Sequence, residues 1–398
     1  MVEISSATVH KKDKRLKSRR QKRSRLYNKT WNLVKQVIVP NIKLKTHHNC
    51  KYSFKDFFKL LTYAGIRNRY AEGSSNKLNF LSDTEFPNGD TLLYHIKKYR
   101  ELELCIQYEK AIDQIITIAK QNGLLKGLVD IAIDFTEILY YGDKNDSMVV
   151  GTKPKNGTTW AYRFATLTII EKECRLTIRV IPVGKNYTKD GIVADLVKYA
   201  QERFMVGVVC IDRGFNSAEV YSALDNLGVT YITPAVLNSR IIWKMRGQQP
   251  PKIIPITIGD PKKKMVTANL VIVLGDDMEK VGFITNMDPD RMHTRKLTKL
   301  YKKLWGIETS YRVKKDFRPK TTSKNYIIRL FYFLFSVCLY DLWEIVNIIY
   351  SLEDKIDPRT PLISAELFGE AIFRIFKRRG TGPPYHNQEK YHARDVEG

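Results

Sequence analysis

The sequence is poor in cysteine and in acidic residues. Its five cysteines (Cys50, Cys105, Cys174, Cys210 and Cys338) are odd in number and never spaced as Cys-x-x-Cys, which argues against a disulfide framework and against a zinc module. The 42 Asp and Glu residues are outnumbered by 67 Lys and Arg residues, so the formal net charge is +25. We therefore expect a polyanionic partner, and duplex DNA, with about one negative charge per 1.7 Å of helix axis, is the first candidate.

The chain also lacks an apolar leader and a long uninterrupted apolar run. Residues 1–10 contain no apolar stretch of the kind that a secretory signal needs, and unpaired cysteines suit a reducing cytoplasm. The most apolar stretch, residues 327–350, is interrupted by Arg329, Asp341 and Glu344, which leaves too few consecutive apolar residues to cross a bilayer. We predict a buried helix here, a cytoplasmic location and no membrane partner.

Composition and periodicity divide the chain into six segments. Residues 11–25 are almost entirely basic and show no apolar periodicity, so they are predicted to be flexible, either as a DNA-contacting arm or as a solvated tail. The other end is too poor in apolar residues to pack. In chain order we predict a basic flexible arm (1–30), a helical DNA-binding domain (31–125), the first part of an α/β core (126–236), a β-rich insertion (237–290), the second part of the core (291–376) and a disordered tail (377–398).

Two helices are predicted in the segment that follows the arm. Ser53 and Asp56 have the spacing of a capping box at the start of the first helix. The second begins near Asp90 and directs Lys97 and Lys98 away from its apolar face, as a DNA recognition helix would. An ordinary packing helix with a basic outer face has the same pattern, so both interpretations stay open.

The segment after Gly123 changes from helical to strand-like periodicity. Three strands are predicted first (128–135, 162–170 and 176–183), then a helix (190–204), a strand (206–212), a helix (217–226) and a strand (229–236). This order predicts a mixed sheet covered by helices. The strand-rich residues 237–290 interrupt the alternation before a long helix resumes near Thr294.

Two aspartates stand at the carboxyl ends of predicted strands. Asp134 closes the run LVDIAID, and Asp212 closes VGVVCID before a glycine turn and a new helix, an order that recurs in site-building α/β folds. Asp130 shares the face of Asp134 because side chains alternate with period two. Periodicity alone therefore leaves Asp130 and Asp134 as competing metal ligands, and either aspartate could also be a turn or capping residue.

A third acid, Glu308, lies on a predicted amphipathic helix. Leu300, Leu304, Ile307 and Tyr311 form its apolar stripe, and Tyr301, Glu308 and Lys315 recur at intervals of seven beside that stripe. An acid flanked by a tyrosine and a lysine at the margin of a buried surface can meet both a metal ion and DNA phosphates.

Taken together, AIDFTEILYYG around Asp134, IDRGFNSAEV around Asp212 and the set Tyr301, Glu308 and Lys315 resemble the prokaryotic insertion-sequence transposases of the DDE type, in the group with a Tyr-Arg-Glu-Lys signature. The arginine position of that signature is occupied by Leu304 here. The resemblance implies an α/β fold of the ribonuclease-H-like class, with a mixed sheet flanked by helices, a β-rich insertion before the last catalytic helix and a helical domain at the N-terminus.

The resemblance also implies roles for individual residues. Asp134, Asp212 and Glu308 would be the catalytic ligands of two Mg²⁺ ions, for which Mn²⁺ would substitute. The partners would be the terminal inverted repeats and target DNA, bound by a homodimer in a synaptic complex at the nucleoid of a prokaryote. The expected DNA-binding residues are Tyr301, Lys302, Lys303, Arg312, Lys315, Arg213, Lys97 and Lys98. Alternatives are a ribonuclease-H-like nuclease without strand transfer, or a noncatalytic DNA-binding remnant.

Overall fold

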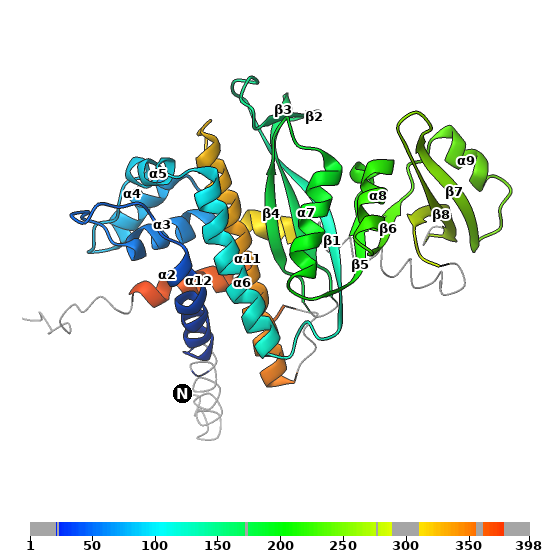
Figure 1. Cartoon of the computed structure of the whole chain (residues 1–398). Coiled ribbons are helices and arrows are strands. Elements are labelled where there is room, and N and C mark those ends of the chain that lie inside the picture. Colours follow the sequence, from blue (N-terminus) through cyan, green and yellow to red (C-terminus); the bar gives the residue numbers. More distant parts are fainter. Residues whose placement is uncertain are drawn as a thin grey trace, which may run out of the picture.

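The computed structural model describes residue 21 and residues 24–171, 174–275, 278–288, 310–355 and 361–377. A mixed sheet stands in the middle, with helices from both ends of the chain on one side and the strands of the insertion on the other (Figure 1). The strands are β1 (Leu128–Leu139), β2 (Val149–Lys155), β3 (Thr158–Ile169), β4 (Thr177–Val183), β5 (Met205–Ile211), β6 (Thr230–Pro234), β7 (Lys252–Asp260), β8 (Lys264–Leu274) and β9 (Lys280–Thr285).

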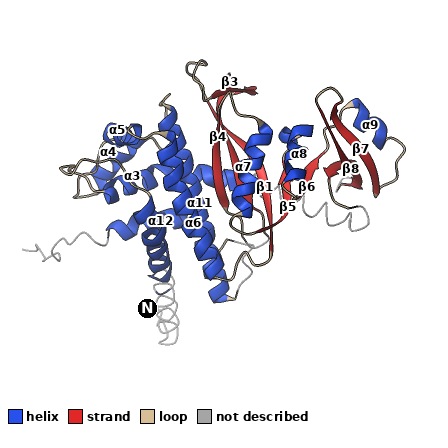
Figure 2. Cartoon of the chain, viewed as in Figure 1, coloured by secondary structure: helices blue, strands red, loops and turns tan. Residues whose placement is uncertain are grey.

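Helices precede the sheet, alternate with its later strands and follow it (Figure 2). Residues 24–33 and 310–316 are also helical. The remaining helices are η1 (Val34–Ile38), α2 (Val39–Asn41), α3 (Phe54–Ile66), α4 (Ala71–Leu81), α5 (Gly89–Lys97), α6 (Glu101–Gln121), α7 (Lys189–Gln201), η2 (Arg213–Phe215), α8 (Ala218–Asn226), α9 (Ser239–Met245), α11 (Tyr326–Asp354) and α12 (Ala365–Lys377). The mixed sheet and the N-terminal helices confirm the predicted architecture.

The strand order is β2-β3-β1-β5-β6-β9-β8-β7 in the described residues, with β4 paired to β3. β1 is antiparallel to β3 and parallel to β5, and β5 is parallel to β6. The strands of the insertion extend this sheet, because β9 pairs with β6. The sequence analysis missed β2, although Asn156 and Gly157, with φ of 48° and 80°, form the Asn-Gly pair that joins hairpin strands.

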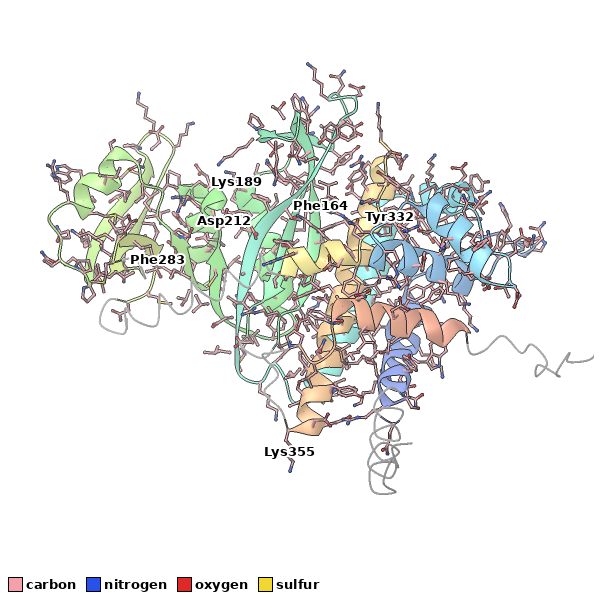
Figure 3. The ribbon with its side chains drawn as sticks, turned by 180° about the vertical axis from the view of Figure 1, so that it is seen from behind. Phe164, Lys189, Asp212, Phe283, Tyr332 and Lys355 are labelled. Carbon is pink, nitrogen blue, oxygen red and sulfur yellow. The ribbon has the colours of Figure 1, made fainter. Side chains whose placement is uncertain are left out.

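Helices cover both faces of the sheet. α7 and α8 lie on the face seen in Figure 1, and residues 310–316 lie on the other, seen from behind in Figure 3. α11 packs beside β3, where the rings of Phe333 and Phe164 stack with centroids 4.5 Å apart. Of the described helices, α11 is long and apolar enough to cross a membrane, but 89% of its most apolar window is buried within the protein. The predicted buried helix is confirmed.

The N-terminal helices contact the C-terminal part of the chain. The capping box of Ser53 and Asp56 is present at the start of α3, as predicted, and α3 packs against α12. At Gly369 of α12, an added Cβ would lie 2.1 Å from the Ile66 Cγ2, so glycine permits this close approach. Residues 365–376 are predicted to belong to the core, whereas α12 packs against α3 of the N-terminal helices.

The prediction of a flexible arm was wrong for residues 24–30, because these residues are helical. Leu26, Leu33 and Val37 are buried at helical spacing, and this apolar face holds the segment against the rest of the protein. The Arg25 guanidinium donates to Asp354 at 2.7 Å and lies 4.4 Å from the centre of the Tyr350 ring. Apart from residue 21, the rest of the predicted arm lies outside the described residues, as does the predicted tail beyond Lys377.

Candidate active site

Asp134 and Asp212 lie beside each other on adjacent parallel strands. Ile133 of β1 is in register with Ile211 of β5, and the backbone N–H of Asp212 donates to the Ile133 carbonyl at 3.2 Å. Residues at equivalent positions of neighbouring strands point to the same face, and such strands are about 4.8 Å apart. The two carboxylates therefore lie close together on one face of the sheet.

The site lies where β5 ends and β1 continues without it. The prediction that Asp134 ends its own strand was wrong, because β1 continues to Leu139 while β5 stops at Ile211. Beyond that point β1 keeps β3 as a neighbour but no longer has β5. The Asp212 carboxylate accepts a hydrogen bond from the Gly214 N–H at 3.1 Å and caps η2, so the turn after β5 fixes its position.

Asp130 has a different role at the other end of β1. Its Oδ1 accepts from the backbone N–H of Val208 at 3.0 Å, at an irregularity in the β1–β5 register. An added Cβ on Gly207 would lie 2.6 Å from this oxygen, so the carboxylate fills the space that glycine leaves. Four residues of strand, about 13 Å, separate Asp130 from Asp134. The register therefore favours Asp134 as the partner of Asp212.

The helical segment 310–316 covers the two aspartates. The Tyr311 hydroxyl is hydrogen bonded to the Thr166 Oγ1 at 2.5 Å, and Thr166 is the residue of β3 that pairs with Asp134. Burial, followed by the negative charge of Asp134, raises the pKa of Tyr311 well above its ordinary value. The hydroxyl therefore keeps its proton beside the carboxylates. The sequence pattern predicts Tyr311 on the apolar stripe and gives no sign of this polar contact.

Five predicted site positions, Tyr301, Lys302, Lys303, Leu304 and Glu308, lie outside the described residues, as does the predicted helix start near Thr294. In the described part of the chain, no group of three or more His, Cys, Asp and Glu side chains is arranged to hold a metal ion. The described residues thus supply two hard carboxylate ligands, Asp134 and Asp212, which suit Mg²⁺.

Basic residues line a groove beside Asp212. A groove of about 760 Å³ is lined by Asp212, Arg213 and Lys189, together with residues of β1, β2 and β3. The Lys189 ammonium donates to the Gly214 carbonyl at 2.7 Å, and Figure 3 shows Lys189 close to Asp212. Arg312 and Lys315 are exposed on the segment 310–316. Arg213 therefore lies beside Asp212 in this groove, and Arg312 and Lys315 belong to the segment that covers the aspartates.

Lys97 and Lys98 lie apart from these residues. They stand at the end of α5, among the N-terminal helices and across α6 and α11 from the sheet (Figure 1). Lys97 is exposed, whereas the Lys98 ammonium lies 4.1 Å from the centre of the Tyr94 ring. A DNA contact by these lysines would belong to a second surface, separate from the acid pair.

A buried group of charges underlies the site. Lys314 and Asp341 are 2% and 0% exposed, and the Lys314 ammonium donates to the Ser310 Oγ at 3.1 Å. Burial lowers the pKa of Lys314 to about 8, against the opposing effects of Asp341, Asp134 and Glu344. The sequence analysis did not identify Lys314, although it lies seven residues after Ile307 and so follows the apolar stripe.

Glu344 of α11 gives this group a testable pH dependence. Burial raises its pKa from 4.5 to about 7. In that pH interval the folded protein holds a proton that the unfolded chain releases, so the free energy of unfolding falls as the pH rises from about 4.5 to 7. Glu344→Gln removes the titrating group and, with it, this fall in the free energy of unfolding. The glutamine side-chain oxygen can still accept from the Tyr340 hydroxyl, which lies 2.8 Å from Glu344.

We expect the stability of Glu344→Gln relative to wild type to rise by about 2 kcal/mol between pH 5 and pH 8. Urea unfolding of both proteins across this range measures the difference. Parallel stability curves would show that Glu344 titrates normally in the folded protein.

Comparisons with known proteins agree with this geometry. Residues 127–340, more than half of the chain, match the family described as "Transposase DDE domain". No curated protein matches the chain. Among solved structures, the chain is similar to the piggyBac transposase in a synaptic complex with hairpin DNA. The TM-score is 0.56 at 13% identity, over 91% of this chain and 82% of that one. This likeness confirms the predicted ribonuclease-H-like fold.

Proposed function

The chain belongs to the DDE transposase family, and we propose that it is the transposase of a prokaryotic insertion sequence, acting at the nucleoid on the element's terminal inverted repeats. It is accordingly a DDE-type enzyme. In the proposed reaction, water attacks the phosphodiester at the element's end, and the freed 3′ hydroxyl then attacks a phosphodiester of target DNA. One O–P bond forms and one breaks in each step.

The observation that carries this proposal is the β1–β5 register, which sets Asp134 and Asp212 side by side where β5 ends. Transposases of this family use divalent metal ions. We propose that Asp134, Asp212 and Glu308 hold two Mg²⁺ ions, with Mn²⁺ as a substitute. Such ions would polarise the attacked phosphate and stabilise the attacking and leaving oxygens.

The position of Tyr311 supports Glu308 as the third ligand. Glu308 precedes Tyr311 by three residues, and on the helix predicted from the sequence both side chains lie on one side. The Tyr311 hydroxyl already meets the β3 partner of Asp134. A carboxylate one turn earlier would then face the same end of β5.

The basic residues around this site would hold the DNA. We propose that Arg213, Arg312 and Lys315 contact phosphates near the cut and that Lys97 and Lys98 contact DNA farther along the terminal repeat. Tyr301, Lys302 and Lys303, which are also proposed to contact DNA, lie outside the described residues. The structural relative is described in a synaptic complex with hairpin DNA, and we propose by analogy that a homodimer brings two element ends together.

The test is a strand-transfer assay with the purified chain, labelled element-end DNA, a target plasmid and Mg²⁺. We expect cut ends and also ends joined to the target. A nuclease without strand transfer would give cut ends alone. Binding without metal-dependent cutting would identify a noncatalytic remnant, and either result would contradict the proposal.

A further inference from the structure

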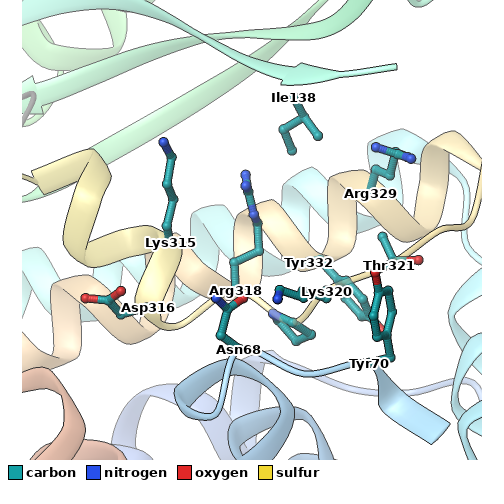
Figure 4. Close-up of a pocket in the computed structure, with 11 residues that line it drawn as sticks. Asn68, Tyr70, Ile138, Lys315, Asp316, Arg318, Lys320, Thr321, Arg329 and Tyr332 are labelled. Carbon is teal, nitrogen blue, oxygen red and sulfur yellow. The ribbon is translucent and has the colours of Figure 1, made fainter. Parts of the chain in front are cut away.

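Two arginines, Arg318 and Arg329, share a basic pocket beside the far end of β1. The pocket has two adjoining parts, of about 410 and 590 Å³, and Ile138, Lys315 and Thr321 line both parts together with the arginines. Figure 4 shows the Lys315 and Arg318 side chains pointing the same way, toward the strand that carries Ile138, with Arg329 on α11 nearby. None of the roles assigned above involves Arg318 or Arg329.

Arg329 is a buried cation with neutral partners. It is 8% exposed, and its guanidinium donates to the carbonyl oxygens of Ser323 at 2.7 Å and Leu139 at 3.1 Å. The rings of Tyr140 and Tyr162 lie 5.8 and 6.0 Å from it. These contacts orient the guanidinium but leave its positive charge uncompensated, and an uncompensated buried charge is unfavourable.

Arg318 adds a second charge close to the first. Burial, and then the positive charge of Arg329, lowers the pKa of Arg318. Among the described residues, the salt bridges include none from Lys315, Arg318 or Arg329. The acid that lines the larger part of the pocket, Glu137, is paired with Arg163 at 2.6 Å. Asp316 lines the smaller part of the pocket, but its carboxylate points away from Arg318 and Arg329 (Figure 4). Two repelling cations whose neighbouring acids are paired or point away form a site for an anion.

The position of the pocket identifies the anion. Ile138 follows Asp134 by four residues on β1, so the pocket begins about 13 Å along the strand from the acid pair and on the same face. Its basic lining extends from Lys315 to Lys155 and Lys324. An elongated row of cations fits successive phosphates of a nucleic acid strand better than it fits one small anion.

We propose that Arg318 and Arg329, with Lys315, bind a backbone phosphate of the DNA strand that is cut, about two to four nucleotides from the scissile phosphate. The inference rests on the proposed function. Arg318 presents a planar guanidinium that can grip two phosphate oxygens at once, while Arg329 is held in place by its carbonyl contacts. The pocket thereby sets the direction in which the strand leaves the metal site.

The experiment uses the full chain and element-end duplexes that carry one neutral methylphosphonate at a time, at each position near the cut. We expect wild type to lose about tenfold in affinity at one or two neighbouring positions, and Arg318→Gln to bind unmodified DNA about tenfold more weakly. At those positions the methylphosphonate should cause no further loss of affinity in Arg318→Gln, because this variant already lacks the contact. Arg318→Lys, which keeps the charge but not the planar grip, should be intermediate.

Lys198→Gln makes the same change of charge on the exposed surface of α7. In this control variant the affinity should depend on the methylphosphonate position as it does in wild type. An unchanged methylphosphonate profile in Arg318→Gln, with wild type still binding and cutting, would overturn the inference alone. Failure of wild type to bind or cut the element's end would instead overturn the proposed function. If inorganic phosphate raises the melting temperature of wild type but not of Arg318→Gln, and no methylphosphonate position is coupled to Arg318, the pocket holds a free anion and the inference is wrong.

Discussion

Asp212→Asn is expected to lower the rate of Mg²⁺-dependent cleavage at the element's end by at least about a thousandfold, which corresponds to about 4 kcal/mol of transition-state stabilisation. The amide oxygen can still accept from the Gly214 N–H, which lies 3.1 Å from the native carboxylate, so the turn after β5 should persist. What disappears is one negative charge beside Asp134. Single-turnover cleavage of labelled DNA gives the rate, and DNA binding without metal should change little.

Asp130→Asn and Asp134→Asn provide matched substitutions on β1. Asp134→Asn should reduce cleavage as severely as Asp212→Asn. Asp130→Asn should cleave at close to the wild-type rate, because its oxygen can still accept from the Val208 N–H, which lies 3.0 Å from the native carboxylate. Rapid cleavage by Asp134→Asn together with loss of activity in Asp130→Asn would reverse the assignment of the metal ligand.

The meeting of Asp134 and Asp212 could be predicted from the sequence because both close apolar runs that are predicted strands of a mixed sheet. Parallel neighbours bring their carboxyl ends to one edge, so two strand-terminal acids are expected to meet. The exact shape of that edge could not be predicted. β1 continues to Leu139 beyond the end of β5, and the length of one strand relative to its neighbour depends on pairing with β3, which the sequence of β1 alone does not encode.

The choice between Asp130 and Asp134 also needed the structure. Both share one face in a period-two pattern, and the difference arises from the irregular register near Val129. The pattern TKPKNGTTW contains the Asn156–Gly157 turn, so β2 could have been found from turn chemistry. β2 was missed because Pro154 and the two flanking lysines, Lys153 and Lys155, hide the alternation of a strand.

The role of Lys314 could not be read from the sequence because its partners lie on another helix. A lysine beside an apolar stripe usually extends its ammonium to solvent. Here α11 packs beside it and brings Asp341 and Glu344 close, as their effects on the pKa of Lys314 indicate. The spacing from Ile307 places Lys314 in line with the apolar stripe, but no local pattern around Lys314 shows that its charge is buried against acids of another helix.

Lys314→Met is expected to destabilise the protein by about 3 kcal/mol at neutral pH. Methionine keeps most of the volume and removes the charge, which leaves Asp341 as a fully buried acid. The Asp341 Oδ1 accepts from the Thr177 N–H at 2.9 Å, but Oδ2 has no hydrogen-bond partner among the described residues. The carboxyl must then take up a proton or remain charged without compensation, and urea unfolding measures the cost.

The double variant Lys314→Met/Asp341→Asn should recover at least half of that loss. Asparagine keeps the acceptor for the Thr177 N–H and removes the uncompensated charge, so the two substitutions are expected to be strongly non-additive. Lys315→Met, one residue along and exposed, should change the free energy of unfolding by less than about 0.5 kcal/mol. Additive effects of the Lys314 and Asp341 substitutions would show that Lys314 stabilises the fold by packing, without electrostatic coupling to α11.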